Sequence, residues 1–227
     1  MKKSILAATL LFALLLPACA APISSSTLDL MDNMQKNDLA PIEISDPNEQ
    51  QGNRKEEITD FSLKLLCEGF AGKNILISPL SIVSALGMVA SGADGRTLSE
   101  MEQVLNSDAK GLNDYLKAYK SYLPSGEKYK VHLANSIWFK DDENLTVNRD
   151  FLQINKDYYD ADIYKTPFNE STKNAINSWV KDKTSGMIEK LLEQAPPEDV
   201  VMYLINALSF DAEWENIYKD TQIRDGE

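Results

Sequence analysis

The spacing of apolar positions along the chain predicts several amphipathic helices. Over residues 54–69, apolar side chains recur on one face at helical spacing, so we expect the ordered part of the chain to begin with a helix there. The same periodicity marks four further helical segments: 97–105, 112–119, 151–158 and 176–187. The first part of the chain should therefore be mainly helical.

Local sequence signals predict where two of the helices begin. Ser78-Pro79 should start a helix, because serine suits the N-cap and proline suits the first helical position, where no backbone donor is lost. Gly92 is expected to stop this helix. Thr97 and Glu100 form a capping-box pattern and predict the start of the next one.

Strand-like segments alternate less regularly with these helices. A short apolar strand is expected at 74–77, another at 163–168, and long strands at 131–139 and 200–210. Both long segments carry apolar residues on both faces, which favours central places in a sheet. Helices followed by long strands, without strict βα alternation, indicate an α+β fold.

The first residues have the pattern of an export signal. Lys2 and Lys3 precede an apolar run that is too short to span a bilayer as a helix, and small residues follow it. We expect residues 1–18 to be a signal peptide of lipoprotein type and Cys19 to be the lipidated residue. Plain secretion is the alternative. Both place the mature chain outside the cytoplasm, as a secreted protein or as a lipoprotein held at the membrane.

The next segment and the overall charge narrow the possible partners. Residues 19–52 are rich in Ser, Asp, Asn, Gln and Pro and are expected to form a flexible tether. The formal net charge of −12 argues against nucleic acid as a partner, since binding to a phosphate backbone needs a basic surface.

The residues that usually carry chemistry are few. The chain has one histidine, His132, inside a predicted strand, and it has no Gly-x-Ser-x-Gly motif, so a hydrolase is not expected. With one histidine and with Cys67 as the only cysteine besides Cys19, a zinc site is not expected, and no phosphate-binding or dinucleotide-binding loop is present. We predict no metal, no cofactor and no enzymatic activity.

Four segments, in order along the chain, resemble the serpins, the serine-protease-inhibitor family. They are Asn74 to Ile82 with the helix that follows, Ala134 to Phe139, Ile176 to Ile188, and Leu204 to Phe210 with Trp214. The resemblance covers residues 54–227. It implies a serpin domain with helices around a large mixed sheet, called sheet A. The chain looks like the N-terminal part of a bacterial lipoprotein-type serpin.

The resemblance also implies a function. A serpin inhibits a serine or cysteine protease when the protease cleaves an exposed reactive-centre loop and the loop inserts into sheet A as a new strand. That loop comes after Glu227 in the family's order. We therefore expect this 227-residue chain to be a fragment that lacks the loop.

Four residues fall at positions where the family has functional regions. Ser78, Ser81 and Asn206 match the shutter, where the sheet parts, and Trp214 matches the breach, where insertion begins. Three of them also have a structural interpretation: Ser78 as an N-cap, Asn206 as a buried amide bonded to its neighbours, and Trp214 as core packing.

The sequence departs from the family's pattern at one further place, and two other functions remain open. Asp211-Ala212 stand where serpins more often have a basic residue and a glycine. A non-inhibitory serpin that acts as a binding or chaperone protein is the nearest alternative. An extracytoplasmic solute-binding lipoprotein is a more distant one and would require βαβ repeats.

Overall fold

The computed structural model describes residues 27–32, 34–39, 52–123, 126 and 128–214. The predicted signal peptide and Cys19 lie outside these residues. The elements, in chain order, are β1 (Leu28–Asp29), α1 (Gly52–Gly69), α2 (Pro79–Ala90), α3 (Gly95–Leu105), α4 (Ala109–Ser121), β2 (Tyr129–Lys140), α5 (Arg149–Tyr159), β3 (Asp162–Thr166), α6 (Glu170–Lys183) and β4 (Met202–Ala212). None of the described helices is long and apolar enough to cross a bilayer.

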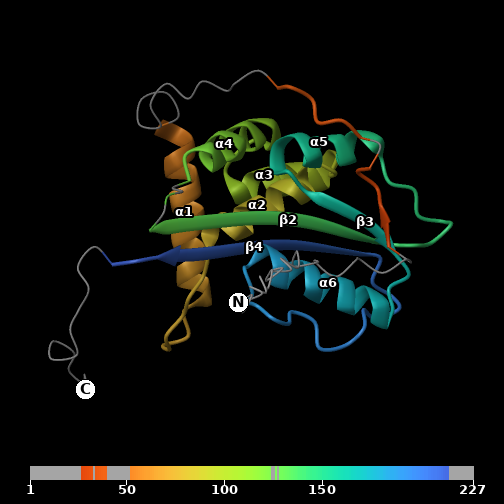
Figure 1. Ribbon diagram of the computed structural model, residues 1–227. Helices are drawn as coiled ribbons and strands as arrows, with labels where there is room; N and C mark the ends of the chain where they lie inside the picture. Colours follow the sequence, from red (N-terminus) through yellow and green to blue (C-terminus); the bar gives the residue numbers. More distant parts are fainter. Residues whose placement is uncertain (1–26, 33, 40–51, 124–125, 127, 215–227) are drawn as a thin grey trace, which may run out of the picture.

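The strands form a four-stranded mixed sheet in the order β1-β3-β2-β4. β2 runs parallel to β3 and antiparallel to β4, with Tyr129 opposite Ala212 at one end and Phe139 opposite Met202 at the other. The central place predicted for 131–139 is confirmed. For 200–210 the described strands supply one neighbour, because β4 pairs with β2 alone, so its central place stays a prediction. Strand β4 has apolar residues on both sides because helices pack on both faces of the sheet (Figure 1).

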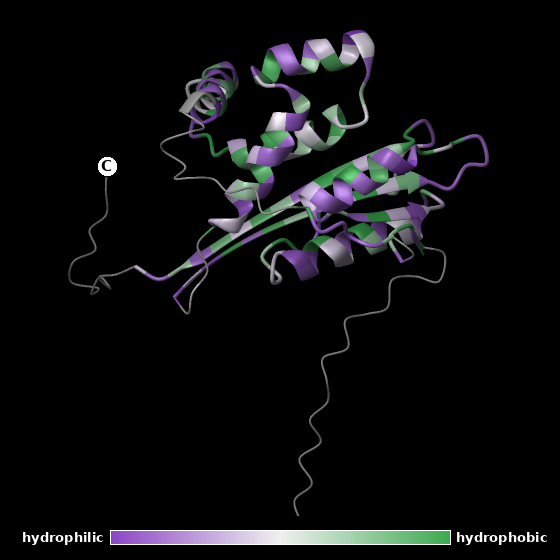
Figure 2. Cartoon of the chain, turned by 90° about the horizontal axis from the view of Figure 1, so that it is seen from above, coloured by the Kyte–Doolittle hydropathy of each residue, from purple (hydrophilic) through white to green (hydrophobic). Residues whose placement is uncertain are grey.

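Side-chain alternation along the strands separates two cores. Ile137 and Phe139 of β2 point into the core shared with α2, α4 and α5, while Trp138 points into the core shared with α6. In Figure 2 the long strands are coloured largely as hydrophobic where helices lie over them. The middle of the sheet is therefore buried on both faces, and the candidate residue Asn206 lies in the middle of β4.

The helix starts were predicted with mixed success. Ser78 is the N-cap of α2, with Pro79 as its first residue, as expected. The start predicted at Thr97 is wrong. Asp94 is the N-cap of α3, and its side chain accepts a hydrogen bond from the backbone N of Gly95 at 2.7 Å. An aspartate N-cap satisfies the same free helix donors, so the helix begins earlier.

The short strand predicted at 74–77 is absent. These residues have no strand partner among the described strands, and the side chain of Leu76 is 96% exposed. An apolar run forms a strand only where another strand satisfies its backbone groups, and here none lies beside it.

Part of the predicted tether belongs to the folded body. We call residues 27–32 and 34–39 the N-terminal strap. Leu28 and Asp29 pair antiparallel with β3, and Leu30 and Met31 pack against the core that the sheet shares with α2, α4 and α5. The expectation of a flexible tether is therefore wrong for the strap. Pairing with a sheet edge and burial of apolar side chains outweigh its polar composition.

Candidate functional site

The start of α2 brings together two of the predicted shutter residues. The Ser78 hydroxyl donates to the Ser81 hydroxyl at 2.9 Å, and the backbone N of Ser81 donates to Ser78 Oγ at 3.3 Å. Ser78 thus has the N-cap role that its position predicted. α2 lies against β4, but no hydrogen bond among the described residues joins either serine to Asn206.

Asn206 belongs to a polar connection across the sheet. Its Nδ2 donates to Oδ1 of Asn135, which lies directly opposite on β2, at 2.7 Å. Asn135 is almost fully buried, and its Nδ2 donates to the carbonyl of Tyr159 at 2.8 Å. The two strands and the end of α5 are therefore linked by side-chain amides within an otherwise apolar layer.

The connection continues between the helices. The Tyr159 hydroxyl donates to Oδ1 of Asn113, whose Nδ2 donates to Ser91 Oγ at 3.1 Å, and that hydroxyl donates to the carbonyl of Gly87 at 2.9 Å. Burial raises the pKa of the Tyr159 hydroxyl well above its ordinary value, so the phenol stays protonated and can donate. Four elements, α2, α4, α5 and the sheet, share one buried polar network.

Gly87 is the point where this network is most tightly packed. A Cβ at this position would lie 2.3 Å from the Tyr159 hydroxyl oxygen. We expect Gly87→Ala to push Tyr159 off Asn113 and to lower the free energy of unfolding by about 1–3 kcal/mol. Chemical denaturation measures this change.

Gly111 in α4 provides the matched control. A Cβ there would meet the end of the Arg54 side chain, which is 26% exposed and forms an ion pair with Asp108. Displacing Arg54 would cost about 0–1 kcal/mol, the usual worth of such a pair, and the preference of a helix for alanine over glycine offsets this loss. Gly111→Ala should therefore leave stability within about 1 kcal/mol of the parent or raise it. Equal losses from the two substitutions would show that the Tyr159 network is not what makes Gly87 sensitive.

One acceptor of the network has no donor. Oδ1 of Asn206 is buried and has no hydrogen-bond partner among the described residues. A buried unsatisfied amide oxygen costs about 1–3 kcal/mol, so the position is costly unless another group reaches it. This oxygen lies in β4, the strand whose second edge is unpaired in the described sheet.

The predicted breach residue, Trp214, follows the end of β4. Its side chain is 78% exposed, so core packing does not explain it within the described residues. Trp214 and the shutter residues do not meet: Trp214 lies past the Ala212 end of β4, whereas Asn206 lies in the middle of the strand.

Sequence reasoning missed Asn135, Tyr159, Asn113 and Ser91. A signal for one of them was available, since Asn135 and Asn206 each interrupt an apolar strand near its middle. Antiparallel pairing with the two amides opposite each other would let them bond to one another, but that register had to be assumed. The helical members carried no local signal, because Asn and Ser on a helix are usually solvated.

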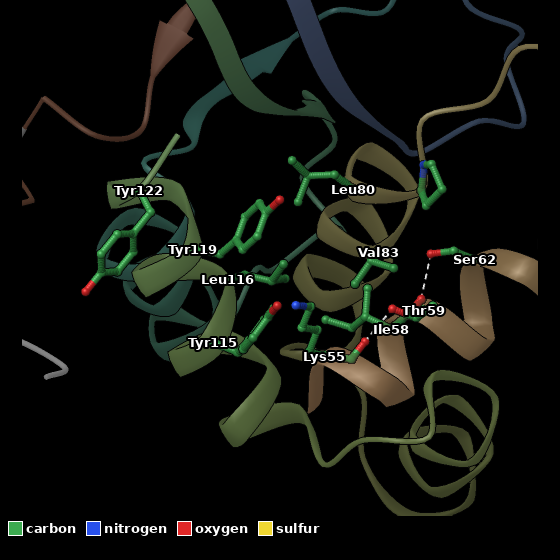
Figure 3. Close-up of a pocket in the computed structure, with 11 residues that line it drawn as sticks. Lys55, Ile58, Thr59, Ser62, Leu80, Val83, Tyr115, Leu116, Tyr119 and Tyr122 are labelled. Atoms are coloured by element: carbon green, nitrogen blue, oxygen red, sulfur yellow. Dashed lines mark hydrogen bonds between the residues drawn. The ribbon is translucent and has the colours of Figure 1, made fainter. Parts of the chain in front are cut away.

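His132 lies in β2, as predicted, with an exposed side chain, and no group of three or more potential metal ligands occurs in the part of the chain that the structure describes. The helices enclose a cavity of about 440 Å³ that is lined mainly by apolar side chains from α1, α2 and α4 (Figure 3). Tyr115, Leu116 and Val83 are among the residues that line it.

Comparison with known proteins agrees with this architecture. The family model described as serpin (serine protease inhibitor) matches residues 56–227. The chain belongs to the serpin family. Human Serpin B9 is 30% identical over 171 residues, which are 72% of this chain and 44% of that protein. Human neuroserpin is 30% identical over 183 residues, which are 75% of this chain and 43% of that protein.

Solved serpin structures show the same fold. The thermophilic serpin tengpin in its native state is 45% identical and superposes with a TM-score of 0.76 over 86% of this chain and 49% of that chain. This serpin chain thus spans about half the length of the relatives that it matches. The sheet order and the family leave the solute-binding lipoprotein without support, since that alternative required βαβ repeats.

Proposed function

We propose that the gene product inhibits serine proteases by loop cleavage followed by strand insertion into sheet A. The observation that supports this proposal is β4, a long strand against which helices pack on both faces of the sheet. This strand is eleven residues long, and it has a single neighbour among the described strands. Helices line both faces of the sheet beside it, so an incoming strand would gain main-chain hydrogen bonds and burial together.

In the proposed reaction the chemistry is supplied by the protease. Its serine oxygen attacks the carbonyl carbon at the loop's cleavage site, the peptide bond breaks, and the new amino end leaves with a proton. The loop stays joined to the protease as an acyl ester, and insertion of the loop beside β4 carries the ester away before water hydrolyses it. The contribution of the described residues is the acceptor strand.

The polar network would set how readily the sheet accepts that strand. Asn206 holds β4 to β2 through Asn135, and its other amide atom, Oδ1, is buried without a donor. A group arriving beside β4 that donates to this oxygen would remove the cost of leaving it unsatisfied. Ser78 and Ser81, at the start of the helix that lies against β4, would take part only through the packing of α2.

The test uses the full gene product with trypsin-like, chymotrypsin-like and elastase-like proteases and one cysteine protease. Inhibition by this route should give a complex that survives denaturing electrophoresis and a stoichiometric loss of protease activity. Cleavage of the loop with no such complex, across all four enzymes, would reject the proposal. That result would favour the alternative, a non-inhibitory serpin that acts as a binding or chaperone protein.

We also propose that the protein is exported and anchored by a lipid on Cys19. The support is the order of two lysines, an apolar run and a cysteine at the start of the chain. Incorporation of labelled fatty acid that is lost in Cys19→Ala would support the anchor. If the parent protein is processed without gaining a lipid, and if it is released to the same extent as Cys19→Ala, the protein is secreted without an anchor.

A further inference from the structure

Specific hydrogen bonds hold the N-terminal strap to the folded body. The backbone N of Leu30 donates to the carbonyl of Ile163 in β3 at 2.9 Å. Asn37 donates to the Asp157 carboxylate twice, from its backbone N at 2.9 Å and from Nδ2 at 2.8 Å. Because Asp157 is only 4% exposed, these are bonds to a buried charge and are stronger than surface contacts.

Cationic side chains add further links between the strap and α5. Lys156 donates from Nζ to the carbonyl of Met31 at 3.1 Å and also to that of Met34. Lys36 pairs with Asp160, which pairs with Lys120 as well. Partial burial opposes ionisation of Asp160, but its bonds to Lys120 and Lys36 outweigh burial and lower the pKa of the carboxyl. The strap is thus attached along α5 as well as at the sheet edge.

The strap enters the body at one end of the sheet. Leu28 lies opposite Lys165, one residue from the carboxyl end of β3, and Lys165 forms an ion pair with Asp141 just after β2. We call this end, with Lys140, Thr166 and Met202, the anchor pole. The end with Tyr129, Ala212 and Trp214 is the breach pole. In Figure 1 the red-orange strap meets the sheet at the end where β4 begins, and β4 ends at the opposite end of the sheet.

Attachment of the strap shortens the reach of any anchor at Cys19. The chain from Cys19 to Thr27 extends at most about 28 Å. If the whole segment up to α1 were free, the same anchor would reach about 110 Å. The two poles are about 33 Å apart along β2, at about 3.3 Å per residue from Tyr129 to Phe139. The shorter reach is less than this separation, whereas the longer reach exceeds it several times.

We propose that the strap orients the protein at the membrane, with the anchor pole against the lipid surface and the breach pole directed away from it. This inference rests on the lipid anchor proposed above. Because the reach is shorter than the distance between the poles, the body cannot turn its breach pole to the membrane. The end of sheet A where the resemblance places the start of loop insertion then faces the surroundings, where a soluble protease would approach.

The orientation can be measured by energy transfer to the membrane. Two single-label variants, Glu143→Cys at the anchor pole and Glu213→Cys at the breach pole, are prepared in the lipidated protein with the exposed Cys67 replaced by serine. Each is labelled with the same donor dye and inserted into phosphatidylcholine vesicles that contain an acceptor lipid. We expect at least twofold greater transfer from position 143 than from position 213.

A linker insertion provides the matched control. About 30 Gly and Ser residues placed between Ser25 and Ser26 lengthen the connection without touching the strap and should abolish the difference between the labels. Asp157→Ala, which removes the buried partner of Asn37, should reduce the difference as well, with near-ultraviolet circular dichroism showing that the body remains folded.

The possible failures are distinguishable. Equal transfer from the two positions in membrane-bound protein, or a difference that survives the linker insertion, would overturn the orientation and leave the anchor intact. If the protein does not bind vesicles, or if Cys19→Ala binds them equally well, the lipid anchor is overturned and the orientation with it.

Discussion

Trp138→Ala is expected to lower the free energy of unfolding by about 3–5 kcal/mol, which is the range for a large aromatic removed from a tightly packed core. The Trp138 side chain is fully buried on the α6 face of β2. Its ring lies against that of Tyr164, with centroids 4.3 Å apart, and its Nε1 donates to Ser136 Oγ at 2.9 Å. Urea denaturation followed by circular dichroism measures the loss.

Trp214→Ala separates the effect of burial from that of residue type. Trp214 is 78% exposed, so its loss should change stability by less than about 0.5 kcal/mol. A change from Trp214→Ala as large as that from Trp138→Ala would mean that Trp214 packs against a part of the protein outside the described residues.

Regular elements were predictable because their signals are local and repeated. The helices at α1, α4 and α5 each carry a sustained apolar face, and the long strand β2 carries apolar residues on both sides. The start of α2 was predictable for the same reason, since Ser78 and Pro79 are adjacent and each favours that position. Asp94 shows the limit of such signals, because the capping-box pattern at Thr97 pointed to a start three residues after the true N-cap.

The strap could not be predicted from the sequence. β1 has two residues, too few for a recognisable alternation, and its partner β3 is more than 130 positions away. The residues that bind the rest of the strap, such as Lys156 and Asp157, look in the sequence like ordinary surface residues of an amphipathic helix. A polar segment therefore looked like a tether, because composition reports average solvation and not specific long-range bonds.

In the candidate site too, local contacts were predictable from the sequence and long-range contacts were not. The contact between Ser78 and Ser81 lies within one helical turn and follows from capping. The pairing of Asn206 with Asn135 depends on strand register, and its link to Tyr159 depends on how α5 packs on the sheet. The family resemblance pointed to one member of the network, Asn206, and only the tertiary structure shows the residues to which it is linked.

Removing residues 1–39 should destabilise the body by about 2–4 kcal/mol relative to a chain that lacks only residues 1–26. The longer truncation exposes the core surface that Leu30 and Met31 cover, worth about 1 kcal/mol for each half-buried side chain. It also removes the two Asn37 bonds to Asp157 and leaves the edge of β3 without a partner.

Thermal unfolding of the two truncated forms, together with binding of a dye that reports exposed apolar surface, tests this expectation. The form that begins at residue 27 keeps the whole strap and is the matched control. Its midpoint should match that of the full chain, whereas the form that begins at residue 40 should unfold at a lower temperature and bind more dye. Identical midpoints for both forms would mean that the strap rests on the body without stabilising it. In that case the strap could not resist the pull of a membrane anchor, and the orientation inferred from it would also fail.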